Sequence, residues 1–369
     1  MANNIFSSLR LRQIINDLKR RPEDASKDLQ IKLPLFNKYL KGKIKIDETF
    51  VRKATKVWPI KIDDFINYNF YKNSPYKIMR AKESEKTKRI MQRGGFDYYE
   101  YRDTVMHRDA PFRPEWIREL VYVKSNSPHE KKLMWNRGHL LHQLTYFVGK
   151  VNFYYIDKNN KKRTAIMNTG DSMYIAPYVP HTFASREINC EGHIIAITFS
   201  DKISTNIQNE VAKLNKKKIK EIIFKKKYIN HSKVTIKKFS SFKKTNSKTP
   251  IKTYELAKNK IISTTRFIQV DVIKNNNLNF LNNFHQYIYI LSNKAKLKIE
   301  KKLVNLRKGD TIYLKPFINY KVPSKKTKIL IAQVQSAFNK ETLEQLYHIG
   351  AKNFGRLIKD NEQWFKNEK

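Results

Sequence analysis

Cysteine is almost absent from this sequence, since Cys190 is the single cysteine among 369 residues. One thiol excludes both an intramolecular disulfide framework and a metal cage built of several thiolates. Long apolar runs are missing as well. No stretch approaches the ~18 apolar residues of a membrane span, and the opening MANNIFSSLRLRQ lacks the apolar segment of a signal peptide. We therefore expect a reduced, cytoplasmic protein with no membrane partner.

Acidic residues are also scarce. Asp and Glu number 33 against 75 Lys and Arg, which gives a formal net charge of +42. Such an excess first suggests a nucleic-acid partner. Lysine, asparagine and isoleucine are abundant along the whole chain, however, which is typical of a genome-wide bias, and the densest charge lies in residues 213–227. We interpret the charge mainly as solvated surface and do not expect nucleic acid as a partner.

The chain is long enough for two or three domains, and its 40% apolar and 12% aromatic residues can fill sizeable cores. Helical periodicity fills residues 1–75, where a short helix, a turn and a second helix ending near Gly42 are typical of a helix-turn-helix. That motif fits DNA reading and a docked helical bundle equally well. We expect a β-rich domain over 76–205, a lysine-rich linker over 206–250, and a second β domain with C-terminal helices over 251–369.

A weak internal repeat predicts that the two β domains are copies of one unit. HQLTYFVGKV, from His142, aligns with HQYIYILSNKAKL, from His285, and GDSMYIAPYVPH (170–181) aligns with GDTIYLKPFINY (309–320). The second copy has asparagine opposite His139 and tyrosine opposite His181. These two histidines are therefore not required by the fold and indicate chemistry confined to the first copy. His142 persists in both copies, and we interpret it as a core residue facing away from the site.

The first copy carries a candidate metal site. Gly138-His139-x3-Gln143-x5-Gly149, followed by Gly170, Pro177 and His181, resembles the two cupin motifs, with glutamine in the position of the usual glutamate. Two neutral imidazoles and a third oxygen donor suit a ferrous ion with open coordination positions. A flat strand would hold positions 139 and 143 ~13 Å apart. Both can bind one ion only if the chain bends between them.

The whole chain resembles a family, the cupin-type non-haem iron phosphonate oxygenases, which include hydroxyethylphosphonate dioxygenase and hydroxypropylphosphonate epoxidase. The resemblance rests on the helix-turn-helix-like domain, a cupin with an Asn-x2-His-x3-Gln pattern, and a degenerate second cupin. It implies a mainly β fold of two cupin barrels after an N-terminal helical domain. It also implies Fe(II) held by His139, Gln143 and His181. In the dioxygenase the glutamate ligand lies six residues before the second histidine, where this chain has Ile175, which we expect to shape the pocket.

The resemblance also implies a substrate site. Asn136 matches an asparagine that holds a phosphonate oxygen, Arg93 and Tyr101 match an arginine and a tyrosine of the phosphonate pocket, and Lys19 matches a lysine reaching in from a neighbouring subunit. A phosphonate carries nearly two negative charges, which a guanidinium fork fits. A hydroxyl donor follows the second histidine, and both Thr198 and Ser200 are candidates. A lysine acting between subunits implies a homo-oligomer, which in this family is a tetramer.

With glutamine at position 143 the chain resembles the methylphosphonate-forming branch of the family, and the resemblance implies its reaction. The expected reaction is oxidative C–C cleavage of 2-hydroxyethylphosphonate to methylphosphonate and CO2, with Fe(II) and O2 and without 2-oxoglutarate. Two alternatives stay open: cleavage to hydroxymethylphosphonate and formate, and a cupin-type regulator that binds DNA through its helix-turn-helix.

Overall fold

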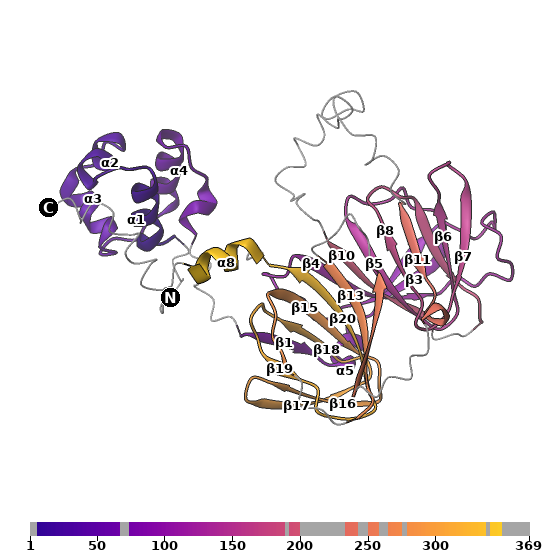
Figure 1. Cartoon of the computed structure of the whole chain (residues 1–369). Helices are drawn as coiled ribbons and strands as arrows, with labels where there is room; N and C mark the ends of the chain where they lie inside the picture. Colours follow the sequence, from indigo (N-terminus) through magenta and orange to yellow (C-terminus); the bar gives the residue numbers. More distant parts are fainter. Residues whose placement is uncertain are drawn as a thin grey trace. The chain divides into compact units, whose positions relative to one another are not determined.

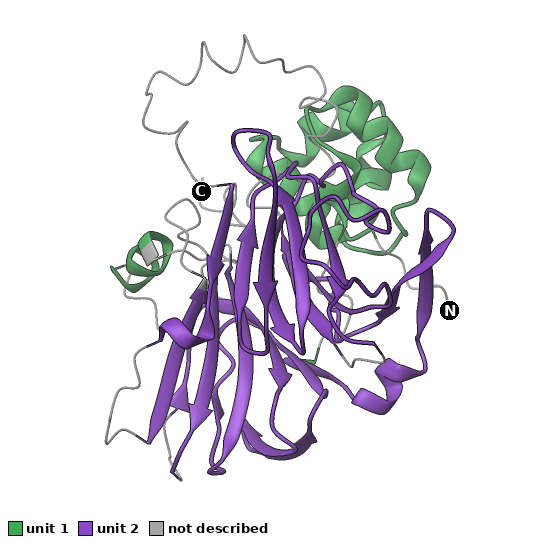
Figure 2. Ribbon diagram, turned by 90° about the vertical axis from the view of Figure 1, so that its right-hand side faces the viewer, with its two compact units in different colours: residues 1–74, 340–369 green, residues 75–339 purple. Residues whose placement is uncertain are grey.

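The computed structural model describes residues 6–66, 74–188, 192–199, 233–242, 250–257, 265–274, 279–336 and 340–348. The chain divides into two compact units, residues 1–74 with 340–369, and residues 75–339 (Figure 2). None of the described helices is both long and apolar enough to cross a bilayer.

The first unit is helical. Its elements are α1 (Ser8–Asp17), α2 (Pro22–Asp28), α3 (Leu33–Leu40), α4 (Glu48–Val57), the 3-10 helix η1 (Ile62–Phe65) and α8 (Lys340–His348). Pro22 opens α2 at a position that needs no backbone N–H, and Asp47 caps α4 by accepting a hydrogen bond from the Phe50 N–H at 2.8 Å. Leu11, Phe36 and Val51 are fully buried, so α1, α3 and α4 enclose one apolar core.

The second unit is mainly β, as the sequence predicts. Its first half, here called the first sandwich, pairs a sheet of order β11-β8-β5-β10-β4-β3-β2 with a sheet of order β7-β6-β9 (Figure 1). The strands of the larger sheet are β2 (Arg89–Arg93), β3 (Phe96–Arg102), β4 (Phe112–Glu119), β5 (His142–Val148), β8 (Ser172–Ile175), β10 (His193–Phe199) and β11 (Val234–Lys237). The smaller sheet holds β6 (Val151–Ile156), β7 (Lys162–Met167) and β9 (His181–Ser185). Phe147, Phe153 and Ile194 from the two sheets share one buried core.

The second sandwich pairs a sheet of order β1-β18-β15-β20-β13-β12 with a sheet of order β14-β19-β16-β17. The larger sheet holds β1 (Tyr76–Met79), β12 (Ile251–Ala257), β13 (Thr265–Val272), β15 (Phe284–Ile290), β18 (Thr311–Leu314) and β20 (Thr327–Gln335). The smaller sheet holds β14 (Asn279–Phe280), β16 (Lys294–Ile299), β17 (Lys302–Arg307) and β19 (Tyr320–Lys321). A further core, which includes Tyr146, Ile197, Phe267 and Tyr313, joins the large sheets of both sandwiches.

The repeat seen in the sequence has a structural counterpart. β5 pairs with β8 in the first sandwich, and β15 pairs with β18 in the second. The His142 ring lies 2.8 Å from the Tyr174 hydroxyl, and the His285 ring lies 2.7 Å from the Tyr313 hydroxyl. These matching contacts within the repeat give a structural reason for the histidine that both copies keep.

Two segments lie outside their predicted domains. β1, inside the segment assigned to the first β domain, pairs with β18 of the second sandwich. β11 and the 3-10 helix η5 (Phe239–Ser241) lie inside the predicted linker 206–250, and β11 pairs with β8 of the first sandwich. The linker prediction was based on the many lysines of this segment. One of them, Lys238, instead forms an ion pair at 2.8 Å with the nearly buried Asp171 of the first sandwich.

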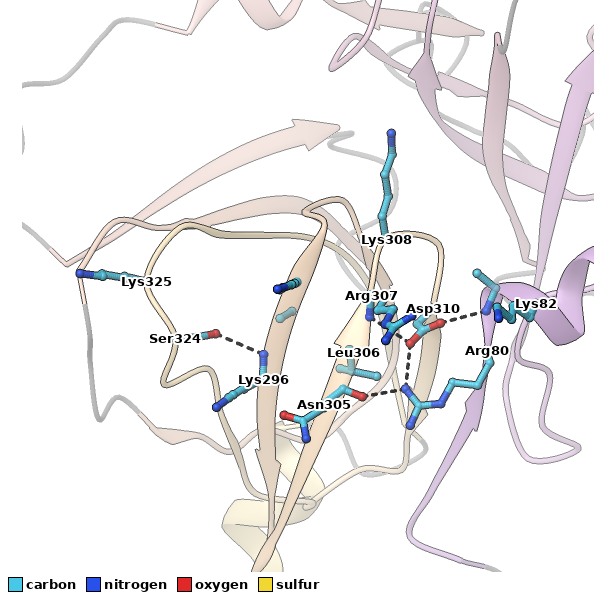
Figure 3. A pocket seen from close by; sticks show the side chains of 13 residues that line it. Arg80, Lys82, Lys296, Asn305, Leu306, Arg307, Lys308, Asp310, Ser324 and Lys325 are labelled. Atoms are coloured by element: carbon cyan, nitrogen blue, oxygen red, sulfur yellow. Dashed lines mark hydrogen bonds and ion pairs between the residues drawn. The ribbon is translucent and has the colours of Figure 1, made fainter.

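A clamp fastens the segment after β1 to the second sandwich (Figure 3). Arg80 donates to the carboxylate of Asp310 at 2.8 Å and to the Asn305 carbonyl at 2.7 Å. The other Asp310 oxygen accepts from the Ala81 backbone N–H at 2.9 Å, at the start of α5 (Ala81–Glu85). The chain then crosses to the first sandwich as β2 and β3, which carry the predicted phosphonate residues.

Candidate metal centre

Seven residues predicted as site residues line one cavity of about 240 Å³ in the first sandwich. They are Arg93, Tyr101, Asn136, His139, Gln143, His181 and Thr198. They come from five strands and from the loop before β5, so segments distant in sequence supply a common site. In the described part of the chain, no group of three or more histidine, cysteine or carboxylate side chains could hold a metal. A third protein ligand beside the two histidines of this cavity would therefore be a neutral oxygen donor, and the Gln143 side chain contacts His139.

The chain bends sharply between His139 and Gln143, as it must if both side chains bind the same metal ion. β5 begins only at His142, and Gly138 has a left-handed φ of +82°. A Cβ at position 138 would lie 2.6 Å from the carbonyl carbon of Tyr178, so this turn admits only glycine. His139 Nε2 consequently lies 3.0 Å from Gln143 Oε1 instead of a full strand length away.

Each histidine is oriented by a backbone carbonyl. His139 Nδ1 lies 2.7 Å from the Leu141 oxygen, and His181 Nδ1 lies 2.8 Å from the Val179 oxygen. A carbonyl can only accept, so both rings carry their proton on Nδ1 and turn the lone pair of Nε2 into the cavity. Such a second contact is the usual companion of a metal-bound imidazole.

The donor set fits a divalent cation. The two rings are edge to face with centroids 5.3 Å apart, and His139 Nε2 lies 3.0 Å from the carbonyl oxygen of Gln143. Two acceptors at 3.0 Å repel each other unless a proton or a cation lies between them. Burial, with smaller contributions from His139 and Arg93, lowers the pKa of His181 to about 4. His181 is therefore neutral at physiological pH, the form that binds metal.

Asn136 joins the two ligand-bearing segments. Its Oδ1 accepts from the Gly138 and His181 backbone N–H groups, both at 2.9 Å, and its Nδ2 lies 3.1 Å from His181 Nε2. The side chain thus stands directly beside the candidate metal position.

The cationic wall of the cavity comes from β2 and β3. The Arg93 guanidinium lies 5.1 Å from the centre of the Tyr99 ring, which holds it over the site. Burial, followed by the charge of Glu115, raises the pKa of Tyr101 to about 12, so its hydroxyl stays protonated and can donate to an anion. Thr198 lies directly opposite Gln143 on β10.

Three predicted site residues are not among the residues that line this cavity. Ile175 is fully buried in the core opposite Gln143 and is not among the residues that line the cavity. Lys19 belongs to the helical unit and lies beyond the end of α1, with a left-handed φ of +54°. Ser200 lies outside the described residues. Contact of Lys19 with the site stays a prediction.

Sequence reasoning missed five lining residues: Tyr99, Glu115, Ile117, Leu141 and Phe183. Two of them had a detectable signal. Tyr99 and Tyr101 lie two residues apart on β3, so their side chains project from the same face of the strand. Glu115 lies two residues before the buried Ile117 on β4, so an acidic side chain shares a face with an apolar one. Burial raises the pKa of Glu115, and the charge of Arg89 opposes this shift.

A larger cleft, of about 710 Å³, lies against the clamp on the second sandwich (Figure 3). No histidine or glutamine is among its lining residues. Cationic side chains dominate its rim, and they belong to Arg80, Lys82, Lys294, Lys296, Arg307, Lys308 and Lys325. The cavity of the first sandwich, although smaller, is the one whose donors suit a transition metal.

No family model matches the chain, whereas known proteins resemble it closely. It is 34% identical to the methylphosphonate synthase of Nitrosopumilus maritimus over 95% of this chain and 94% of that protein. It is 30% identical over 29% of its length to (S)-2-hydroxypropylphosphonic acid epoxidase of Streptomyces wedmorensis, covering 52% of that enzyme. A solved Streptomyces albus 2-hydroxyethylphosphonate dioxygenase with substrate and Fe(II) bound superposes with a TM-score of 0.82 and 25% identity, over 95% of this chain and 96% of the other.

Proposed function

This chain belongs to the family of methylphosphonate synthase and the related phosphonate oxygenases, and we propose that it converts 2-hydroxyethylphosphonate to methylphosphonate and CO2. It is a non-haem iron oxygenase with Fe(II) as cofactor. The two sandwiches represent two cupin barrels, of which only the first is catalytic. The observation that carries the proposal is Gln143, between two histidines whose Nε2 atoms face the cavity.

His139, Gln143 and His181 would hold the iron. When bound, Fe(II) supplies the activation of O2 that oxidises the substrate. An amide oxygen is a neutral ligand, so this site is one charge more positive than a site with two histidines and a glutamate. An anionic substrate is held more strongly there. Ile175 supports the synthase assignment, because an alkyl side chain cannot supply the glutamate ligand expected of the dioxygenase at that position.

The other cavity residues bind and orient the substrate. Arg93 and the protonated Tyr101 bind phosphonate oxygens from one wall, and Asn136 binds next to the histidines. The Thr198 hydroxyl donates to the Arg113 carbonyl at 3.1 Å and would turn from it to donate to the substrate. Lys19 completes the anion site from a neighbouring subunit of a homo-oligomer. Apolar neighbours such as Ile117 and Phe183 exclude water from the reacting carbon.

The reaction balances without a second organic substrate. 2-Hydroxyethylphosphonate and O2 give methylphosphonate, CO2 and water: the C–C bond breaks, the hydroxyl-bearing carbon leaves as CO2, and the phosphonate-bearing carbon gains one hydrogen. The substrate supplies all four electrons that reduce O2. The chain therefore needs no 2-oxoglutarate.

Two other functions remain for comparison. Cleavage to hydroxymethylphosphonate and formate uses the same site, and the dioxygenase likeness favours it as the second candidate. DNA binding by a regulator is not favoured, because the relative that matches along 95% of this chain is named as an enzyme.

Phosphorus NMR of the full-length protein, loaded anaerobically with Fe(II) and then given 2-hydroxyethylphosphonate and air, tests the proposal. We expect one new resonance from methylphosphonate and release of CO2. Hydroxymethylphosphonate with formate would move the chain to the sister activity. Unchanged substrate in iron-loaded protein would overturn the oxygenase assignment.

A further inference from the structure

An amide ligand poses a problem that a carboxylate does not. The two oxygens of a glutamate are equivalent, whereas the glutamine amide has one end that can bind a metal and one that cannot. A half-turn of the Gln143 amide would present its NH2 group to the metal and abolish ligation. A chain that uses glutamine here needs a group that accepts a hydrogen bond from the amide NH2 when the amide oxygen binds the metal.

The geometry points to Thr145 as that group. Gln143 Nε2 donates to Thr145 Oγ1 at 2.8 Å, and this contact leaves Oε1 turned toward His139 Nε2 at 3.0 Å. Thr145 is fully buried, and it lies two residues after Gln143 on β5, so both side chains project from the same face of the strand. We propose that Thr145 is the positioning residue that holds the NH2 group of the Gln143 amide when the amide oxygen binds the iron.

The second sandwich provides an internal comparison. Gln286 is the repeat counterpart of Gln143, and its Oε1 accepts from the Tyr320 hydroxyl at 3.2 Å and from Gln333 Nε2 at 2.9 Å. Tyr320 and Gln333 occupy the positions of His181 and Thr198, so hydrogen bonds between protein side chains replace the candidate ligands.

The residue that corresponds to Thr145 in that copy is Ile288, which is fully buried. The fold therefore accepts an aliphatic side chain at this position, and packing alone does not require a hydroxyl. The hydroxyl occurs in the copy whose glutamine faces a histidine, and it is missing in the copy whose glutamine is bound by protein groups. The difference between Thr145 and Ile288 is one of residue identity, so it supports the proposal independently of the hydrogen-bond distances.

The inference rests on the proposed iron site, and metal affinity tests it without reference to turnover. Metal-free full-length protein is titrated with Co(II), whose visible d–d absorption reports binding, and the dissociation constant is obtained by competition with a chelator. The variants are Thr145→Val, Thr145→Ser, Gln143→Glu and the double variant Gln143→Glu/Thr145→Val. His181→Ala shows that the signal comes from this site.

We expect Thr145→Val to weaken Co(II) binding by roughly 10- to 100-fold, the usual effect of losing an orienting contact behind a ligand. Serine at 145 keeps the hydroxyl and restores affinity to within about 3-fold. In the Gln143→Glu background we expect Thr145→Val to weaken Co(II) binding by less than about 3-fold, because either carboxylate oxygen can ligate. An equal loss in both backgrounds would show a packing effect and overturn the assignment.

Wild-type affinity in Thr145→Val would likewise overturn the role of Thr145 while leaving the iron site intact. If the wild type binds no Co(II), or binds it equally well with His181→Ala, the proposed iron site itself is overturned. Circular dichroism establishes that each variant is folded. If Thr145→Val does not fold, Thr145→Ala removes the hydroxyl with a smaller side chain. Its Co(II) affinity is then compared in the wild-type and Gln143→Glu backgrounds.

Discussion

His139 Nε2 lies 3.0 Å from Gln143 Oε1, although four residues of extended strand would separate the two positions by ~13 Å. The contact exists because β5 starts after His139 and because the chain reverses at Gly138. The site is therefore built at the entry to a strand, where the backbone is free to turn. The local chain path, and not only the choice of ligands, determines whether a metal can bind.

The first prediction concerns that turn. Gly138→Ala must place a Cβ 2.6 Å from the Tyr178 carbonyl carbon at a left-handed φ, so we expect a loss of more than about 2 kcal/mol in unfolding free energy and loss of Co(II) binding. Gly95→Ala is the matched control, because Gly95 has φ +80° with no atom within 4 Å of an added Cβ. Chemical denaturation of both variants separates the clash from backbone strain. Equal losses would contradict the role of the clash.

The second prediction tests the ligand set. His139→Ala and His181→Ala should each bind Fe(II) at less than about a tenth of wild-type affinity, with turnover lost, because two protein ligands remain. His142→Ala is the control. It is adjacent in sequence, but its ring contacts the Tyr174 hydroxyl and not the cavity. Iron content after gel filtration provides the measurement. Full iron in either ligand variant would refute the assignment.

These features also show what the sequence could and could not predict. The paired motifs and the repeat predicted His139, Gln143 and His181 as candidate ligands, because a local pattern carries ligand spacing. β1 was assigned to the wrong sandwich, since its pairing with β18 joins residues more than 200 positions apart and has no local signal. Glu115 was missed for a related reason. The sequence does not show from which face of the sheet its side chain projects, because this depends on how β4 pairs with its neighbouring strands.

The third prediction concerns the end point of the reaction. Gln143→Glu restores a carboxylate, which lowers the charge of the site by one and removes the need for amide orientation. We expect slower turnover and a shift of product from methylphosphonate toward hydroxymethylphosphonate. Phosphorus NMR quantifies both products in a single spectrum. An unchanged product ratio would show that the ligand at 143 does not set the end point.

The fourth prediction concerns the anion wall. Arg93→Lys keeps the charge but loses the planar fork, so we expect kcat/KM to fall roughly 10- to 100-fold, mainly through a higher KM. Arg163→Lys is the control, because Arg163 pairs with Asp157 at 2.8 Å outside the cavity. Steady-state oxygen consumption against substrate concentration gives both constants. A fall in kcat at unchanged KM would argue against a binding role for Arg93.

The last prediction concerns pH and stability. Burial lowers the pKa of His285 from its ordinary 6.5 to about 4 in the folded chain, with Lys315 and His107 acting in the same direction and Asp109 opposing them. Between these two pH values the unfolded chain binds a proton that the folded chain does not. Stability is thus fully present above pH 6.5 and is lost as the pH falls toward 4, by up to about 3 kcal/mol for this group.

His285→Gln removes this linkage, so unfolding free energy should fall less steeply between pH 6.5 and 5 than in the wild type, by about 1 kcal/mol per pH unit. His129→Gln, at an exposed position, should follow the wild-type curve. Urea denaturation of metal-free protein at half-unit pH steps gives the slopes. This interval lies above the range in which most carboxylates titrate, so the difference in slope reports the buried imidazole. Parallel curves for His285→Gln and the wild type would mean that His285 is protonated equally in both states.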